Sequence, residues 1–147
     1  MKENFQFKLE KHQTHSINDN HVNGSLTVIW RDWDQILKNT PKMVYVSSVE
    51  PGEIKGPHIH VKRNSYFTCI HGKVVFILQS DEGEFLEIES SAENAVMVYV
   101  PKNIASAHIN LSDSTSTVLT LADLAWRPND QEMKNVTFIN YDWKKWI

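Results

Sequence analysis

The 147-residue sequence contains a single cysteine, Cys69. One thiol excludes an intrachain disulfide and a cysteine-based zinc site. The first residues, MKENFQFKLEKH, lack the apolar core of a signal peptide, and no apolar run approaches the roughly 18 residues of a spanning helix. We therefore expect a cytoplasmic protein that is not inserted in a membrane.

A surplus of positive charge is also missing. Fifteen Lys and Arg residues stand against 18 Asp and Glu residues, which gives a formal net charge of −3. Proteins that bind nucleic acid through its phosphates are usually basic, so nucleic acid is not an expected partner. The 41% of hydrophobic and 22% of charged residues are ordinary for a folded globular protein, and the length fits one domain.

Internal repeats and long helical periodicity are absent, whereas short β-rich runs recur between turn-forming residues. Such a chain is expected to be all-β, with two packed antiparallel sheets. A short helix is predicted over residues 32–38, and an acidic hairpin over residues 80–93. Residues 1–25 are expected to form a polar arm or edge strand, and residues 26–147 the main domain. The β-rich runs cover residues 27–30, 43–46, 66–70, 74–78, 85–88, 96–100 and 117–121.

The segment Lys55-Gly56-Pro57-His58-Ile59-His60-Val61-Lys62-Arg63 holds three fixed cations and two histidines without an acidic residue. In an extended strand every second side chain lies on one face, so His58, His60 and Lys62 are expected to point the same way. Two neighbouring imidazoles can act as base and hydrogen-bond donor, or can bind one metal ion. An exposed edge strand would explain the pattern equally well.

Two later segments also contain side chains that could serve a site. Ser106, His108 and Asn110 would share one strand face by the same period of two. The tail after residue 123 is rich in aromatic residues, including Trp126, and such rings either stack on a base or sugar or pack against a sheet.

Three segments, taken in order, resemble the RmlC-like cupins, the group that contains the dTDP-4-dehydrorhamnose 3,5-epimerases and related nucleotide-sugar epimerases and isomerases. They are Gly52 to His58, Phe67 to Phe76, and Val98 to His108. The resemblance covers about residues 44–126 and implies a jelly roll of two antiparallel sheets with a pocket between them. By analogy it also implies a homodimer.

The resemblance implies roles for individual residues. His58 takes the position of the catalytic base, and His60 and His108 line the pocket. Lys55, Lys62 or Arg63 would hold the pyrophosphate, and Trp126 or Tyr66 would stack on the nucleobase.

The sequence also departs from the epimerase pattern. Ser65 stands where the epimerases hold a substrate-contacting lysine, and their proton-donating tyrosine falls near Thr120. The carboxylate that should orient His58 is not fixed by the alignment, and Asp123 and Asp142 are candidates. One epimerisation, or a ketoisomerisation, would need fewer groups than the full 3,5-epimerisation.

The implied reaction removes a proton next to the ketone of a 4-keto-6-deoxy sugar nucleotide, a small-molecule substrate, and needs neither metal nor redox cofactor. His58 would abstract the proton, and His60 or His108 would donate to the enolate oxygen. Two other functions are compatible with the same residues. His58, His60 and His108 could form a three-histidine metal site, or the protein could bind a sugar or nucleotide without catalysis.

Overall fold

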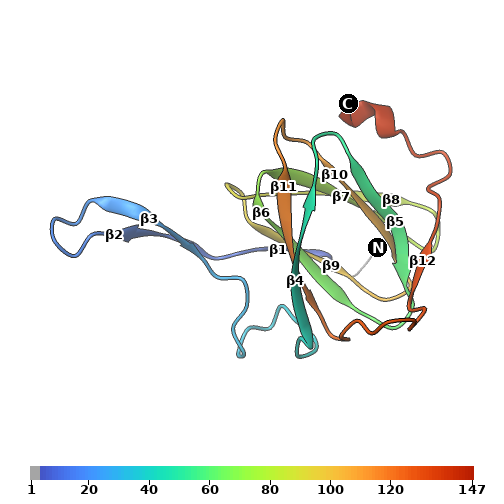
Figure 1. Cartoon of the computed structure of the whole chain (residues 1–147), viewed down its shortest axis with the longest axis horizontal. Helices are drawn as coiled ribbons and strands as arrows, with labels where there is room; N and C mark the ends of the chain where they lie inside the picture. The colour runs from blue at the N-terminus through green and yellow to red at the C-terminus, as the bar shows by residue number, and fades with distance from the viewer. Residues whose placement is uncertain (1–3) are drawn as a thin grey trace.

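The computed structural model describes residues 4–147, which form two five-stranded antiparallel sheets and a separate two-stranded hairpin (Figure 1). The first sheet has the order β1 (Gln6–Lys8), β9 (Val96–Val100), β6 (Ser65–His71), β11 (Ser116–Ala122) and β4 (Met43–Val49). The second has the order β12 (Met133–Asn135), β5 (Ile54–His60), β10 (Ala105–Asn110), β7 (Lys73–Gln79) and β8 (Phe85–Ser91). The expected all-β architecture of two packed sheets is confirmed.

Strand β7 shows how the sequence produces this arrangement. Its run Val74 to Leu78 is apolar at every position, and both faces of the strand are covered. Val74, Phe76 and Leu78 face the first sheet, whereas Val75 and Ile77 pack on the opposite side. Continuous apolar runs are typical of strands that are buried on both faces.

The C-terminal segment supplies the cover on the outer side of the second sheet. Phe138, Tyr141, Trp143 and Trp146 pack over Val75 and Ile77, and the 3₁₀ helix η1 (Trp143–Trp146) ends the segment. The rings of Phe138 and Trp143 are stacked, with centroids 6.0 Å apart. The packing interpretation of these tail aromatic residues is therefore confirmed, with Trp126 as an exception.

The predicted helix at residues 32–38 is wrong, because this segment consists of turns. The carboxylate of Asp34 accepts hydrogen bonds from the backbone N–H and the side chain of Arg31, which fixes a local turn instead. Ile36 and Leu37 still pack against the core. A seven-residue helix has little stability of its own, so these local and tertiary contacts decide the conformation.

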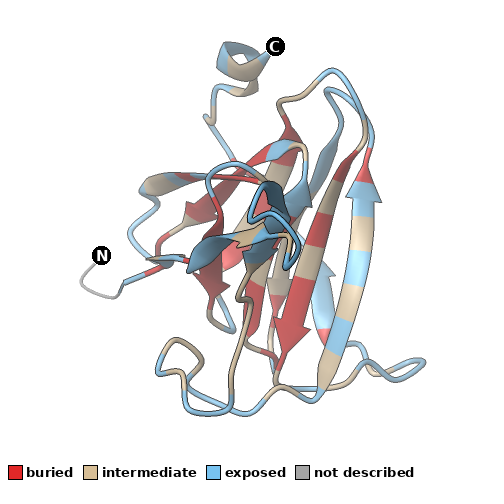
Figure 2. Cartoon of the chain, turned by 90° about the vertical axis from the view of Figure 1, so that its left-hand side faces the viewer, coloured by how far each residue is buried: buried red, intermediate tan, exposed pale blue. Residues whose placement is uncertain are grey.

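The N-terminal segment is an arm only in part. Strand β1 joins the first sheet beside β9, and the chain then forms the hairpin of β2 (Lys11–His15) and β3 (Val22–Thr27). The hairpin extends away from the two sheets in Figure 1 and is almost entirely exposed in Figure 2, where it points toward the viewer. The predicted strand at residues 27–30 is correct only at Thr27, and residues 1–3 of the expected arm lie outside the described residues.

The acidic stretch after Ser80 is the solvated hairpin that was predicted, since β7 and β8 pair on either side of a turn at residues 81–83. No helix in residues 4–147 has the length and apolar character that crossing a membrane requires.

Candidate active site

The segment from Lys55 to His58 forms a bulge at the start of β5. In the pairing with β10, Ser106 lies opposite His58, but His108 lies opposite Lys55, so β5 contains an extra residue between them. Gly56 has a φ of 92°, and a Cβ atom on it would lie 2.8 Å from the carbonyl oxygen of Ser106. Glycine is therefore required here, and the bulge turns both Lys55 and His58 toward the space between the sheets.

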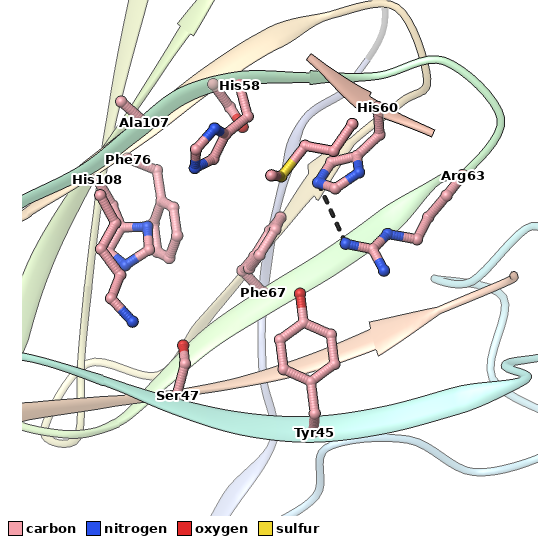
Figure 3. A pocket seen from close by; sticks show the side chains of 12 residues that line it. Tyr45, Ser47, His58, His60, Arg63, Phe67, Phe76, Ala107 and His108 are labelled. Carbon is pink, nitrogen blue, oxygen red and sulfur yellow. Dashed lines mark hydrogen bonds between the residues drawn. The ribbon is translucent and has the colours of Figure 1, made fainter. Parts of the chain in front are cut away.

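That space is a cavity of about 200 Å³. The first sheet contributes Tyr45, Ser47 and Phe67 to its walls, and Arg63 and Met133 complete the lining. Figure 3 shows His58 and Tyr45 entering the cavity from opposite sides. The second sheet contributes Lys55, His58, His60, Phe76, Ser106, Ala107 and His108.

His60 is held at both ring nitrogens. Its Nδ1–H donates to Glu132 Oε1 at 2.8 Å, and its Nε2 accepts a hydrogen bond from Arg63 Nη2 at 3.2 Å (Figure 3). Arg63 Nε lies 3.7 Å from the same Glu132 oxygen. All three side chains are buried, so the carboxylate and the guanidinium compensate each other's charge inside the protein.

Burial lowers the pKa of His60 below its ordinary value, and the positive charge of Arg63 acts in the same direction. The hydrogen bond to Glu132 opposes both effects. Because its Nε2 accepts from Arg63, His60 does not offer an N–H to the cavity. The group that faces a ligand here is the guanidinium of Arg63 rather than the imidazole.

His58 and His108 are the two imidazoles of the cavity that lie outside this ionic cluster. His58 Nδ1 donates to the side-chain oxygen of Asn135 at 3.0 Å, which leaves the lone pair on Nε2. His108 has its Nε2 atom buried and without a hydrogen-bond partner among the described residues. Burial is the main effect that lowers the pKa of His108 to about 4, and the neighbouring Lys55 and His58 act in the same direction. It is therefore neutral at physiological pH.

Two of the expected substrate-binding residues lie elsewhere. Lys62 does not share the face of His58 and His60, because β5 ends at His60 and the chain bends at residues 61 and 62. Tyr66 is only 2% exposed and stacks on Tyr99, while its hydroxyl accepts a hydrogen bond from the backbone N–H of Lys38. Tyr66 is a core residue and has no access to a ligand in the cavity.

Lys62 instead borders an open groove of about 500 Å³ together with Lys42 and Lys102. Asp123 lies in this groove, where its carboxylate accepts hydrogen bonds from the backbone and side chain of Asn64. The groove is a separate, positively charged surface that shares no lining residue with the cavity.

Trp126 borders a depression that includes two residues of the cavity wall. It is 64% exposed and borders a depression of about 290 Å³ with Met43, Tyr45 and Arg63. Tyr45 and Arg63 also line the cavity itself, so the depression and the cavity share these two lining residues.

Two expectations remain, namely the shared face of Ser106, His108 and Asn110 and the carboxylate beside His58. Ser106 and His108 both line the cavity, but the side chain of Asn110 donates to the backbone carbonyls of Val49 and Ser114. Neither suggested carboxylate contacts His58, because Asp123 binds Asn64 and Asp142 caps η1.

Glu132, Asn135 and Tyr45 are site residues that the sequence did not reveal. Glu132 and Asn135 reach the histidines because β12 pairs with β5, with Asn135 opposite His58. This contact spans more than 70 positions of the chain, and no local pattern signals it. Tyr45 could have been found from the period of two in β4, which places it on the same face as Ser47.

The geometry does not support the three-histidine metal site. In the part of the chain that the structure describes, no three His, Cys, Asp or Glu side chains are grouped so that they could hold one ion. The Nε2 atom of His60 would also have to give up its hydrogen bond to Arg63 before it could bind a metal.

Solved structures with the same fold are similar to this chain over most of its length. A dTDP sugar isomerase from Desulfovibrio desulfuricans G20 has a TM-score of 0.78 at 16% identity, with 95% of this chain and 90% of that chain covered. A dTDP-4-dehydrorhamnose 3,5-epimerase from Elizabethkingia anophelis NUHP1 has a TM-score of 0.73 at 18% identity, with 95% and 80% covered. These likenesses confirm the RmlC-like cupin jelly roll.

The capsular polysaccharide assembling protein CapF from Staphylococcus aureus has a TM-score of 0.62 at 23% identity over 67% of this chain. The match covers only 27% of CapF, so this chain corresponds to about a quarter of that protein.

The comparison with curated proteins gave no match. The family model described as FdtA: WxcM-like, C-terminal matches residues 7–143, and the chain therefore belongs to this family.

Proposed function

We propose that the protein is an epimerase or isomerase that acts on a 4-keto-6-deoxy sugar nucleotide by removing a proton next to the ketone. One observation carries the proposal: the cavity brings the imidazoles of His58 and His108 together with the guanidinium of Arg63. Membership of the family and the activities printed for the dTDP sugar isomerase and the 3,5-epimerase support the same reaction class.

The groups in the cavity match the needs of enolate chemistry. A carbon next to a ketone loses its proton to a base, and the charge that develops on the ketone oxygen needs a nearby donor or cation. His58 has a free Nε2 and acts as the base, oriented through Nδ1 by Asn135. Arg63 and neutral His108 lie in the same cavity and stabilise the enolate oxygen.

The size of the cavity limits which part of the substrate it can hold. A volume of about 200 Å³ is below the 300 to 1,000 Å³ that is usual for larger ligands, so it admits a single sugar ring. The diphosphate and the nucleoside must then lie outside. The depression beside Trp126 suits the nucleobase, because an exposed indole can stack on it.

We also propose that the protein is a homodimer. An isolated two-stranded hairpin is at best marginally stable in water, yet the β2–β3 hairpin extends away from the two sheets (Figure 1). Val22 and Leu26 on the hairpin and Val44 and Val46 on edge strand β4 are each more than half exposed. A second copy that covers these side chains would remove apolar surface from water. Light scattering on the purified protein should give twice the mass of the chain.

The function is tested by incubating the protein with a dTDP-4-keto-6-deoxyhexose in deuterium oxide. We expect deuterium at a carbon next to the ketone, followed by a product of altered configuration or with a displaced ketone. His58→Asn should abolish the exchange, whereas His71→Asn, which replaces an exposed histidine outside the cavity, should leave it unchanged. Binding of the sugar nucleotide without exchange by the wild-type protein would instead show a non-catalytic binder.

A further inference from the structure

One end of the first sheet brings several loops together outside the cavity. In the last row of paired residues at this end, Ala122 of β11 lies between Met43 of β4 and Ser65 of β6. Strand β9 ends in the same row, because Val100 pairs with Ser65. The chain segments just beyond this row form the open groove of about 500 Å³, which we call the lysine groove. Its lining residues are Asn39, Thr40, Lys42, Lys62, Asn64, Lys102 and Asp123.

Hydrogen bonds hold the loops around the lysine groove in place. The backbone N–H and the side-chain amide of Asn64 donate to the two carboxylate oxygens of Asp123, each at 2.8 Å. The side-chain oxygen of Asn64 accepts from the backbone N–H of Lys102 at 2.9 Å. The backbone N–H of Lys42 donates to the carbonyl oxygen of Ala122 at 2.7 Å. The backbone from which these lysine side chains extend is therefore fixed before any ligand binds.

Positive charge exceeds negative charge in the lysine groove, although the whole chain has a formal net charge of −3. Asp123 is the one carboxylate among the described lining residues, and it also accepts a hydrogen bond from Asn39 at 3.3 Å. Asp130 interacts electrostatically with Lys62, but it does not line the groove, and its carboxylate accepts hydrogen bonds from two backbone N–H groups. Within residues 4–147, no hydrogen bond or ion pair engages the ammonium groups of Lys42, Lys62 and Lys102.

We propose that the lysine groove is a second binding site, which takes a small, highly polar molecule with two or more negative charges on phosphate groups. Lysine ammonium groups bind phosphate as point charges, and here three of them surround one hollow. The volume lies within the 300 to 1,000 Å³ that is usual for small-molecule sites. A compact ligand fits this arrangement better than a long polymer, which would need charges spread along an extended face.

The lining also indicates which phosphate compounds fit. Among the described residues of the groove there is no aromatic or aliphatic side chain, so a nucleobase would find no surface on which to stack. The hydroxyl of Thr40 and the side-chain oxygen of Asn39 can instead bind sugar hydroxyls. Inorganic diphosphate and sugar phosphates share the required chemistry. The inference does not rest on the proposed function, because the groove and the cavity have no lining residue in common.

Calorimetric titration of the whole protein with inorganic diphosphate tests the site. At an ionic strength of about 0.15 M we expect one site per chain with a Kd below about 1 mM, and weaker binding at about 1 M salt. Lys62→Gln and Lys102→Gln should each weaken binding about tenfold, the usual effect of losing one charged contact. Lys134→Gln removes the same charge from exposed strand β12, outside the groove, and should bind as the wild-type protein does.

Two further titrations identify the source of the phosphate and the place where it binds. Tighter binding of glucose 1-phosphate than of inorganic diphosphate would indicate a sugar phosphate as the ligand, and the reverse order would indicate a diphosphate. Either order supports the site if Lys62→Gln and Lys102→Gln weaken the binding. Lys55→Gln, which changes the cavity wall, should leave the binding of inorganic diphosphate unchanged.

Several results would overturn the inference. These are the absence of saturable binding to the wild-type protein, wild-type affinity in both groove variants, and an equal loss in Lys134→Gln. Binding that is lost only in Lys55→Gln would place the anion in the cavity and would overturn it as well. None of these results bears on the exchange of substrate protons at His58, which tests the proposed function separately. Because the three substituted lysines outside the cavity are exposed, their variants should unfold at the wild-type temperature.

Discussion

The buried histidine of the cavity makes the stability of the protein depend on pH. The pKa of His108 falls from an ordinary value of 6.5 to about 4 in the folded protein, chiefly because of burial. Between these two values the unfolded chain binds a proton at this residue that the folded protein does not. The free energy of unfolding therefore decreases as the pH falls from about 6.5 to about 4. Above pH 6.5 the residue contributes no dependence on pH.

The size of this decrease follows from the shift. Each pKa unit corresponds to about 1.4 kcal/mol, so His108 accounts for at most about 3 kcal/mol between pH 7 and pH 4. Such a loss is a large part of the 5 to 15 kcal/mol that stabilises an ordinary domain, by the general estimate of roughly 0.05 to 0.15 kcal/mol per residue. His60 has a lowered pKa for the same reason and acts in the same direction.

Urea unfolding of the wild-type protein and of His108→Gln at several pH values measures the effect. Glutamine does not titrate, so the variant should lose less stability than the wild-type protein between pH 7 and pH 4, with a difference of up to about 3 kcal/mol. The comparison uses the slope with pH rather than the stability at one pH, because the substitution also changes packing. Equal slopes for the two proteins would refute the reasoning.

Three further predictions concern other parts of the site. Glu132→Gln leaves the buried Arg63 without its counter-charge and should lower the free energy of unfolding by about 3 kcal/mol, measured in urea at pH 7. Gly56→Ala forces a side chain into a left-handed conformation against Ser106 and should cost about 1 to 3 kcal/mol in the same assay. Trp126→Ala should weaken binding of dTDP about tenfold or more in calorimetry without changing the melting temperature, because the exposed indole packs little.

The fold follows from local patterns, and this part of the prediction succeeded. Strand β7 and its neighbours are marked by apolar runs between turn-forming residues, and such runs fold as strands wherever they lie in the sheets. The helix predicted at residues 32–38 failed because Asp34 and Arg31 satisfy each other in a turn. A helix of seven residues forms too few backbone hydrogen bonds to be more stable than this turn.

The site was predicted only as far as the strand geometry extends. The period of two places His58 and His60 correctly, and it fails at Lys62 because the chain is no longer extended after His60. The same rule states that Tyr66 and Phe67 face opposite ways, but it does not state which of them faces the cavity. Because both side chains are aromatic, their residue types do not show which one lines the cavity. The packing of the two sheets places Phe67 in the cavity wall.

The two histidines of the H-x-H pair differ because of partners that lie far away in the sequence. Glu132 carries a charge and binds His60 within a compensated ionic cluster, whereas Asn135 is neutral and orients His58 without adding a charge. A histidine fixed between a carboxylate and a guanidinium has no free nitrogen for proton transfer, so we propose that His60 positions Arg63. The short motif therefore marks the place of the site, and the pairing of β12 with β5 determines which imidazole is available as a base.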